Sequence, residues 1–200
     1  MWPRQCQSVK LVNRKTQARL DPRDPLVLDT RELGRRPGSM RRLSFPVLAP
    51  AGFALELIGV PAGAQLHLDL RLESVMEGVL VTGTVTAALE GECSRCLGPV
   101  TGEVVADVQE LFAYPDSTTE ETTEDGEVSR FEGDFLDLEP VVRDAVVLAL
   151  PLVPLCREDC AGLCATCGER WDELPTDHLH EAADPRWAAL AKLQDDSQES

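Results

Sequence analysis

Residues 66–73 read LHLDLRLE, and residues 78–90 read GVLVTGTVTAALE. In the first stretch four leucines alternate with His, Asp, Arg and Glu; in the second, Val, Ala and Leu alternate largely with Thr. Alternation with a period of two, rich in Val and Thr, is typical of half-buried antiparallel strands. The two stretches therefore predict a sheet with one wet face, strongly curved or barrel-like.

Shorter apolar runs surround this pair of strands. They are expected to add further strands at 25–28, 43–48, 53–60 and 100–112. A different spacing follows, because apolar residues recur at three- and four-residue steps from Leu138 to Ala149, the stripe of an amphipathic helix. Asp137 is the predicted N-cap of this helix and Pro151 its stop. A last short helix is predicted from Pro185 to about residue 193.

Six of the seven cysteines form close pairs: Cys93 with Cys96, Cys156 with Cys160, and Cys164 with Cys167. Two of the pairs have the Cys-x-x-Cys spacing that lets neighbouring thiolates bind one tetrahedral ion, with Zn–S distances of about 2.3 Å. A site closed by four protein ligands leaves no position for substrate, so it is structural. The chain is therefore predicted to bind one or two structural Zn²⁺ ions.

Three ligand sets are compatible with the spacing. Cys93 and Cys96 could join Cys156 and Cys160, which leaves Cys164 and Cys167 to pair with His178 and His180. Cys93 and Cys96 could instead join Cys164 and Cys167, or the last four cysteines could share one ion. The first set is favoured because it uses all six paired thiols and both histidines.

The charge is divided unevenly. Residues 1–42 contain eleven Lys and Arg against four Asp and Glu, a net +7, whereas residues 43–200 carry a net −23. Nucleic-acid affinity comes largely from cations that displace counterions from phosphates, so the acidic body is a poor RNA ligand. Only the N-terminal segment is expected to make many phosphate contacts.

Several classes of protein are disfavoured. No stretch approaches the roughly 20 apolar residues of a membrane span, and the basic N-terminus does not resemble a signal peptide. Closely paired cysteines indicate zinc in a reducing compartment, so we expect a cytoplasmic protein without membrane contact. No deaminase, phosphate-loop, His-Glu-x-x-His or Gly-x-Ser-x-Gly motif is found. We therefore expect no enzymatic activity.

These features give an α+β fold. The expected architecture is a curved antiparallel β-sheet or partial barrel, then a helix, a Cys-rich zinc-knuckle region and a short C-terminal helix. Four segments are expected: a flexible basic extension (1–20), an antiparallel β domain (21–113), an acidic mobile loop (114–133), and a helical and zinc-knuckle region packed on the sheet (134–200). The loop assignment depends on seven carboxylates between residues 115 and 133.

Several motifs resemble one family. They are CSRCLGPV at 93–100, LEPVVRD at 138–144, LPLVPL at 150–155 leading into the cysteines that end at Gly168, ELGRRPG at 32–38, and DPRWAAL at 184–190. Together they resemble the YceD family of large ribosomal RNA subunit accumulation proteins, in its actinobacterial branch, over roughly residues 21–193. Some members lack the second Cys-x-x-Cys, which supports the first ligand set. Many others have cysteines where this chain has His178 and His180.

The resemblance implies a ribosome-biogenesis factor that supports accumulation of large-subunit (23S) rRNA. Combined with the charge, it predicts contact with the large-subunit precursor through a basic ribosomal protein or assembly factor. RNA contact is assigned to the N-terminal basic segment, through Arg35, Arg36, Arg41 and Arg42. The alternatives are a thiol redox protein and a zinc-ribbon regulatory or interaction module.

Overall fold

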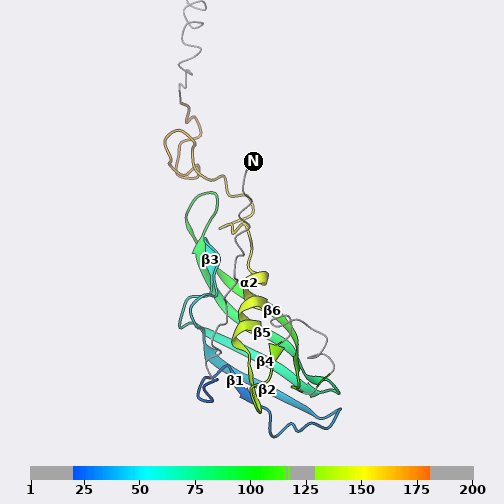
Figure 1. Cartoon of the computed structure of the whole chain (residues 1–200). Helices are drawn as coiled ribbons and strands as arrows, with labels where there is room; N and C mark the ends of the chain where they lie inside the picture. Colours follow the sequence, from blue (N-terminus) through cyan, green and yellow to red (C-terminus); the bar gives the residue numbers. More distant parts are fainter. Residues whose placement is uncertain (1–19, 116, 118–128, 181–200) are drawn as a thin grey trace, which may run out of the picture.

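The computed structural model describes residues 20–115, 117 and 129–180 (Figure 1). Most of the strand residues among them belong to a six-stranded sheet with the order β2-β4-β5-β6-β7, and β3 pairs with β5 off this path. The long strands are β2 (Met40–Leu48), β4 (Gln65–Ser74), β5 (Gly78–Glu92) and β6 (Pro99–Ala113). The short ones are β3 (Ile58–Gly59) and β7 (Ser129–Arg130).

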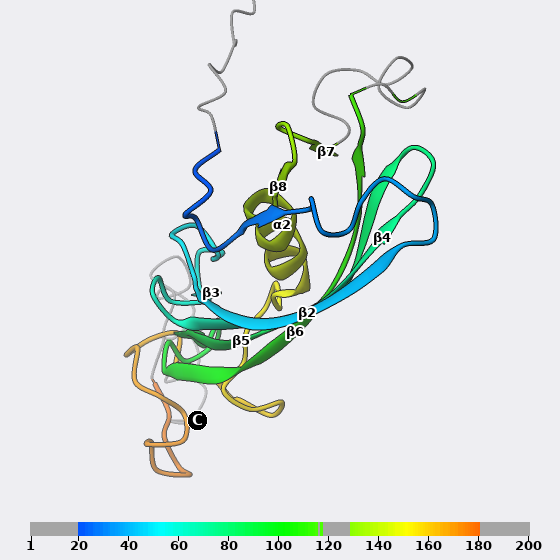
Figure 2. The same cartoon turned by 90° about the horizontal axis from the view of Figure 1, so that it is seen from below.

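A smaller element lies beside this sheet. Strands β1 (Val27–Asp29) and β8 (Phe135–Asp137) form a two-stranded antiparallel sheet, and helix α2 (Glu139–Ala149) follows β8 directly. Figure 2 shows α2 lying against one face of the large sheet. No helix in the described part of the chain is long and apolar enough to cross a membrane.

The long strands pair antiparallel in sequence order, and among the described strands only β7 joins the sheet in parallel. Within the described ranges, β2 pairs only with β4 and β7 only with β6, so the sheet is open. The barrel considered from the sequence is thus not closed. The protein is mostly β-sheet with one described helix, followed by the cysteine-rich segment.

The alternating stretches form the core as predicted. The leucines of 66–72 are at most 1% exposed, and Val142 and Val146 of α2 are fully buried among the same residues. Gly83 permits close packing of β5 on β4, because a β-carbon there would lie 2.1 Å from the carbonyl oxygen of Asp69. The apolar face of the sheet is therefore the face that α2 covers.

Two expectations need correction, and two fall outside the described residues. Residues 53–60 form a tight turn with only Ile58–Gly59 in a strand, because Leu55 and Val60 pair locally with Ile58 and Phe53. The helix cap is Leu138, although the Asp137 carboxylate does accept the Glu139 N–H at 2.9 Å. The helix predicted after Pro185, and residues 1–19 of the extension predicted at 1–20, lie outside the described residues.

The segment predicted as an acidic mobile loop lies mostly outside the described residues as well. Its described end is well packed: the Phe131 ring is buried 5.4 Å from the Tyr114 ring. The two aromatic rings thus pack together directly after the ends of β6 and β7.

Candidate metal centres

The first Cys-x-x-Cys turn forms the tip of the β5–β6 hairpin. Glu92 pairs with Pro99 at the end of the ladder, and the chain turns between them. The Cys93 N–H donates to the Gly98 carbonyl at 2.8 Å, and the Leu97 N–H donates to the Cys93 carbonyl at 2.9 Å. Leu97 adopts a φ of 58°, the left-handed conformation that closes such a turn. Both thiols therefore point to one side of the hairpin tip.

The segment after α2 brings Cys156 and Cys160 to the same place. Pro151 ends the helix, and the Ser94 N–H donates to the Pro154 carbonyl at 2.9 Å. The Arg95 guanidinium then donates to the Cys160 carbonyl at 2.9 Å. These bonds dock the segment on the first turn.

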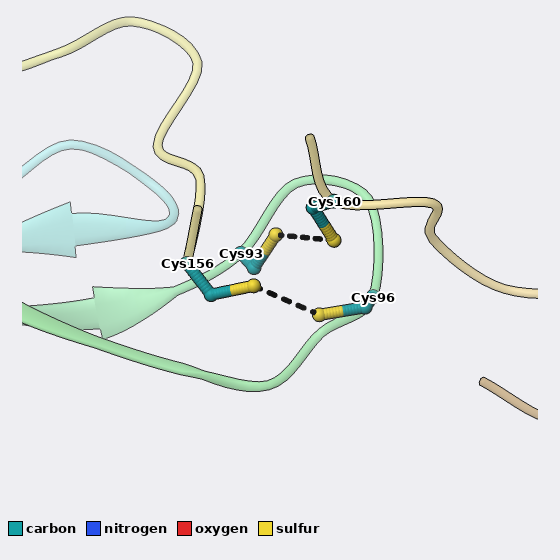
Figure 3. A group of neighbouring side chains, drawn as sticks. All are labelled: Cys93, Cys96, Cys156 and Cys160. Atoms are coloured by element: carbon teal, nitrogen blue, oxygen red, sulfur yellow. Dashed lines mark hydrogen bonds between the residues drawn. The ribbon is translucent and has the colours of Figure 1, made fainter. Parts of the chain in front are cut away.

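Figure 3 shows the four sulfur atoms of this first cluster (Cys93, Cys96, Cys156 and Cys160) pointing toward one another. All four sulfurs lie within 4.8 Å of one another, with Cys93 Sγ 3.8 Å from Cys160 Sγ and Cys96 Sγ 3.6 Å from Cys156 Sγ. An ideal ZnS₄ tetrahedron has S···S edges of about 3.8 Å, given Zn–S bonds of about 2.3 Å. The cysteines are free thiols, so the donor set fits one tetrahedral ion.

The protonation of the first cluster also fits a cation site. Burial disfavours the Cys93 thiolate, but backbone N–H groups of Cys96, Cys156 and Arg95 lower its pKa to about 6. The hydrogen bond with Cys160 and burial raise the pKa of Cys156 to about 12. Without a cation, neighbouring thiols cannot all ionise, and a bound metal removes that conflict.

The second Cys-x-x-Cys turn repeats the backbone of the first. The Cys164 N–H donates to the Glu169 carbonyl and the Gly168 N–H to the Cys164 carbonyl, both at 2.8 Å. Gly168 takes the position of Leu97, with a φ of 77°. Its hairpin is only the single bridge between Leu163 and Arg170.

The second cluster combines Cys164 and Cys167 with His178 and His180, whose ligand atoms lie within 4.8 Å of one another. Cys167 Sγ is 3.6 Å from His178 Nε2. Zn–S and Zn–N bonds of about 2.3 and 2.05 Å in a tetrahedron place these atoms about 3.6 Å apart. Only Cys164 is buried, and the His178 ring packs edge-on against Trp171. This cluster is therefore nearer the surface than the first.

Hydrogen bonds from the backbone of Cys167 and Thr166 lower the pKa of Cys164 to about 6, despite burial. One thiolate in each cluster is thus stabilised by N–H groups of its own turn. That shared feature comes from the turn geometry, because the N–H groups point inward at the first cysteine.

Arg170 connects the two clusters. A β-carbon added at Gly98 would lie 2.6 Å from Arg170 Nη1 and 3.4 Å from Cys96 Sγ, so the guanidinium and the thiol flank the same glycine. Asp172 holds Arg170 by two hydrogen bonds of 3.1 and 3.0 Å, and Arg157 joins the group through Asp172 at 3.3 Å. Asp172, with a smaller contribution from Cys96, raises the pKa of Arg170. The second hairpin thereby carries a cation to the first cluster.

Of the three ligand sets compatible with the sequence, the structure brings together the first. Two groups of potential metal ligands occur among the described residues, and they are the two clusters above. Arg170 was missed as a neighbour of the first cluster. Its sequence position, three residues after Cys167, gives no sign of contact with a turn more than 70 residues earlier.

The four arginines assigned to RNA have different surroundings. The Arg35 guanidinium lies 4.7 Å from the centre of the Tyr114 ring, and Arg41 forms an ion pair with Glu32 at 3.1 Å. Arg36 is exposed in a turn. Arg42 is exposed on β2 directly opposite Arg71, a second cation on that face of the sheet.

The fold and the two clusters define a class: a mostly β-sheet protein with one described helix and two groups of four Cys or His side chains that could each hold a metal ion. The family model of the large ribosomal RNA subunit accumulation protein YceD matches residues 81–194. The chain belongs to the YceD family. Its matched region contains both clusters and α2.

Similar proteins share most of the chain. Uncharacterized protein Rv2926c of Mycobacterium tuberculosis (strain ATCC 25618 / H37Rv) is 54% identical over 169 residues, 84% of this chain and 81% of that protein. Uncharacterized protein ML1660 of Mycobacterium leprae (strain TN) is 47% identical over 84% of this chain and 77% of its own length. Uncharacterized protein YlbN of Bacillus subtilis (strain 168) is 29% identical over 68% of this chain and 77% of its own length. No solved structure matches.

Proposed function

We propose that this protein is a non-enzymatic, cytoplasmic ribosome-biogenesis factor that supports accumulation of 23S rRNA and holds structural zinc. The observation that carries the proposal is membership of the YceD family, whose description names the large ribosomal RNA subunit. That description points to a role in forming the large subunit, and a deletion experiment tests the specific effect on 23S rRNA.

The zinc ions would stabilise the fold and take no part in chemistry. Cys93, Cys96, Cys156 and Cys160 would hold one ion, and Cys164, Cys167, His178 and His180 the other. Each set supplies four protein ligands, which leaves no open coordination position for substrate. The first ion would fix the segment after α2 to the tip of the β5–β6 hairpin. Four thiols converge in the first cluster. This arrangement suits a tetrahedral metal ion better than a redox-active pair of cysteines, which needs only two thiols.

Charge supports a protein partner for the acidic body. Residues 43–200 carry a net −23, which opposes direct binding to phosphate backbones. We propose that this body binds a basic ribosomal protein or assembly factor, and that Arg35, Arg36, Arg41 and Arg42 contact RNA. A pull-down at physiological salt should recover a basic protein. Recovery of naked rRNA fragments without one would contradict this part of the proposal.

The function is tested by deleting the gene in its own host and measuring 23S against 16S rRNA and the ribosomal subunit profile. We expect a lower 23S to 16S ratio, restored by the wild-type gene and not by Cys96→Ser. An unchanged ratio would instead favour a zinc-ribbon regulatory module. A thiol redox role would be indicated by native disulfides and no bound metal in a mass spectrum.

A further inference from the structure

Strand β6 has one open side. On its inner side β5 pairs with it along its whole length, from Pro99 to Ala113. On its outer side, within the described part of the chain, β7 pairs only with Phe112 and Ala113. The outer edge between about Val100 and Leu111 therefore has no neighbouring strand there, and such an edge is a template for another extended chain.

A groove runs between this edge and α2. Its volume is about 470 Å³, and its lining includes Val108 and Gln109 of β6 with Val141, Ala145 and Leu148 of α2. Leu148 is 85% exposed at the end of the helix. The next large exposed apolar residues along the chain are Leu152 and Val153. The apolar part of the groove thus lies mainly on its helix side, through Val141, Ala145 and Leu148, and polar residues line much of the rest.

The rim of the groove is acidic. Asp107 and Glu110 lie along the strand and Asp144 along the helix, and no Lys or Arg is among the described residues that line the groove. The nearby cation of α2, Arg143, is paired with Glu139. Three carboxylates without a cation repel phosphates and attract a basic chain.

We propose that this groove binds an extended, basic peptide segment of a partner protein, which adds to β6 as a further strand. Main-chain hydrogen bonds to the β6 edge would supply affinity, as in other complexes formed by strand addition. Side chains of a strand alternate, so apolar ones would contact the Leu148 side and basic ones the carboxylates. This proposal rests on the proposed function, because it names the site at which the basic partner binds.

The test uses the full-length protein and a capped ten-residue peptide of alternating lysine and valine. Binding is measured by fluorescence anisotropy, and hydrogen exchange reports on the backbone amides of residues 101–111. We expect slower exchange of those amides with the peptide bound. Two matched probes, one with glutamate in place of lysine and one N-methylated at alternate residues, should bind at least tenfold more weakly.

Surface variants locate the site. The pair Asp107→Lys and Asp144→Lys, and separately Leu148→Lys, should each weaken peptide binding at least tenfold. Asp69→Lys on β4 and Met76→Lys, which replaces a residue 83% exposed, should leave binding unchanged. Equal binding by all variants, or protection outside β6, would overturn the proposal. Tighter binding after Lys10, Arg14 and Lys15 are changed to Gln would also overturn it, since the chain's own basic segment would then be the occupant.

Failure of this proposal is distinguishable from failure of the proposed function. Suppose that the deletion strain has low 23S rRNA but the purified protein does not bind the peptide. The proposed function would then stand, and the proposed peptide site in the groove would be excluded. If the deletion strain instead has normal 23S rRNA and the peptide binds at β6, the peptide site would stand and the proposed ribosomal role would be excluded.

Discussion

The turns at 93–98 and 164–169 share the same backbone hydrogen bonds but differ in everything around them. The first is the tip of two 15-residue strands and encloses buried thiols. The second is closed by one bridge, and its Cys167 is exposed. The left-handed position is Leu97 in the first turn and Gly168 in the second.

This difference shows that the Cys-x-x-Cys turn determines the direction in which the thiols point. The surrounding structure determines how much a metal bound there contributes to the stability of the fold. A metal in the first cluster ties distant parts of the chain together, because Cys93 and Cys160 are separated by 67 residues. A metal in the second cluster joins residues between 164 and 180. We therefore expect the two sites to be unequal in their effect on stability.

Loss of a cysteine should have the largest effect. Cys96→Ser removes a buried ligand of the first cluster and should cost more than about 4 kcal/mol of unfolding free energy, the range of lost metal sites. The matched variant Cys167→Ser removes the equivalent exposed ligand and should cost about 1 kcal/mol. Chemical denaturation of both variants, with zinc counted by native mass spectrometry, measures the contrast. Equal losses of unfolding free energy in the two variants would show that burial and the long strands around the first cluster do not increase its contribution to stability.

Arg170, from the hairpin of the second cluster, is expected to affect metal binding at the first cluster. A zinc ion bound by four thiolates leaves excess negative charge in a buried place, which a nearby cation offsets. Arg170→Ala should therefore lower the zinc affinity of the first cluster about tenfold or more. Arg170→Lys should restore part of the loss, because the charge remains but the two-pronged bond to Asp172 does not.

The control for Arg170 is Arg31→Ala, which removes a cation that pairs with Asp29 and Asp134 far from the cysteines in sequence. Its zinc affinity should match that of the wild type in competition with a chelating indicator. If Arg170→Ala also matched the wild type, the guanidinium would have no electrostatic role at the first cluster.

Zinc affinity of the first cluster should rise with pH. In the metal-free protein Cys93, with a pKa of about 6, is ionised at neutral pH, whereas Cys156, with a pKa of about 12, keeps its proton. Loading must displace that proton, so affinity should rise about tenfold per pH unit for each proton released between pH 7 and 9. Indicator competition across this range, with proton release measured in weak buffer, checks it. A flat profile would mean that Cys156 is not a ligand.

The smallest effect should come from exchanging the left-handed residues. Leu97 is 58% exposed, and a non-glycine residue in this conformation costs about 1–2 kcal/mol. Leu97→Gly should therefore raise the free energy of unfolding by about 0.5–1 kcal/mol after the added freedom of the unfolded chain is counted. Gly168→Leu should lower it by about 1–2 kcal/mol, although open space surrounds a β-carbon there.

The two exchanges are measured by denaturant titration of the zinc-loaded protein, and neither should alter zinc stoichiometry. A loss of stability on Leu97→Gly would indicate that the leucine side chain, and not its backbone, matters at that position.

Much of the sheet could be predicted because its signal is local. Leu66 to Leu72 alternate with polar residues, and pleating alone places them on one face. The helix at 139–149 was equally visible from its spacing and from Pro151. The turn at 53–60 was not, since its apolar residues fit a strand and only its local hydrogen bonds reveal a tight turn. Strand propensity there gives way to the local hydrogen bonds of the turn.

The candidate sites followed a similar division. Cysteine spacing predicted two turns, and their clustering with Cys156, Cys160 and the two histidines was one of three sets that the spacing allowed. The contact of Arg170 with Gly98 and the open edge of β6 depend on how distant segments pack. No periodicity in the sequence carries that information.

The most direct measurement is a native mass spectrum of full-length protein purified without chelators. We predict the mass of the reduced chain with two zinc ions, falling to one in Cys167→Ser while the first cluster stays loaded. A metal-free chain that still unfolds cooperatively with six reduced thiols would contradict the account, because the clusters would then be held by packing alone.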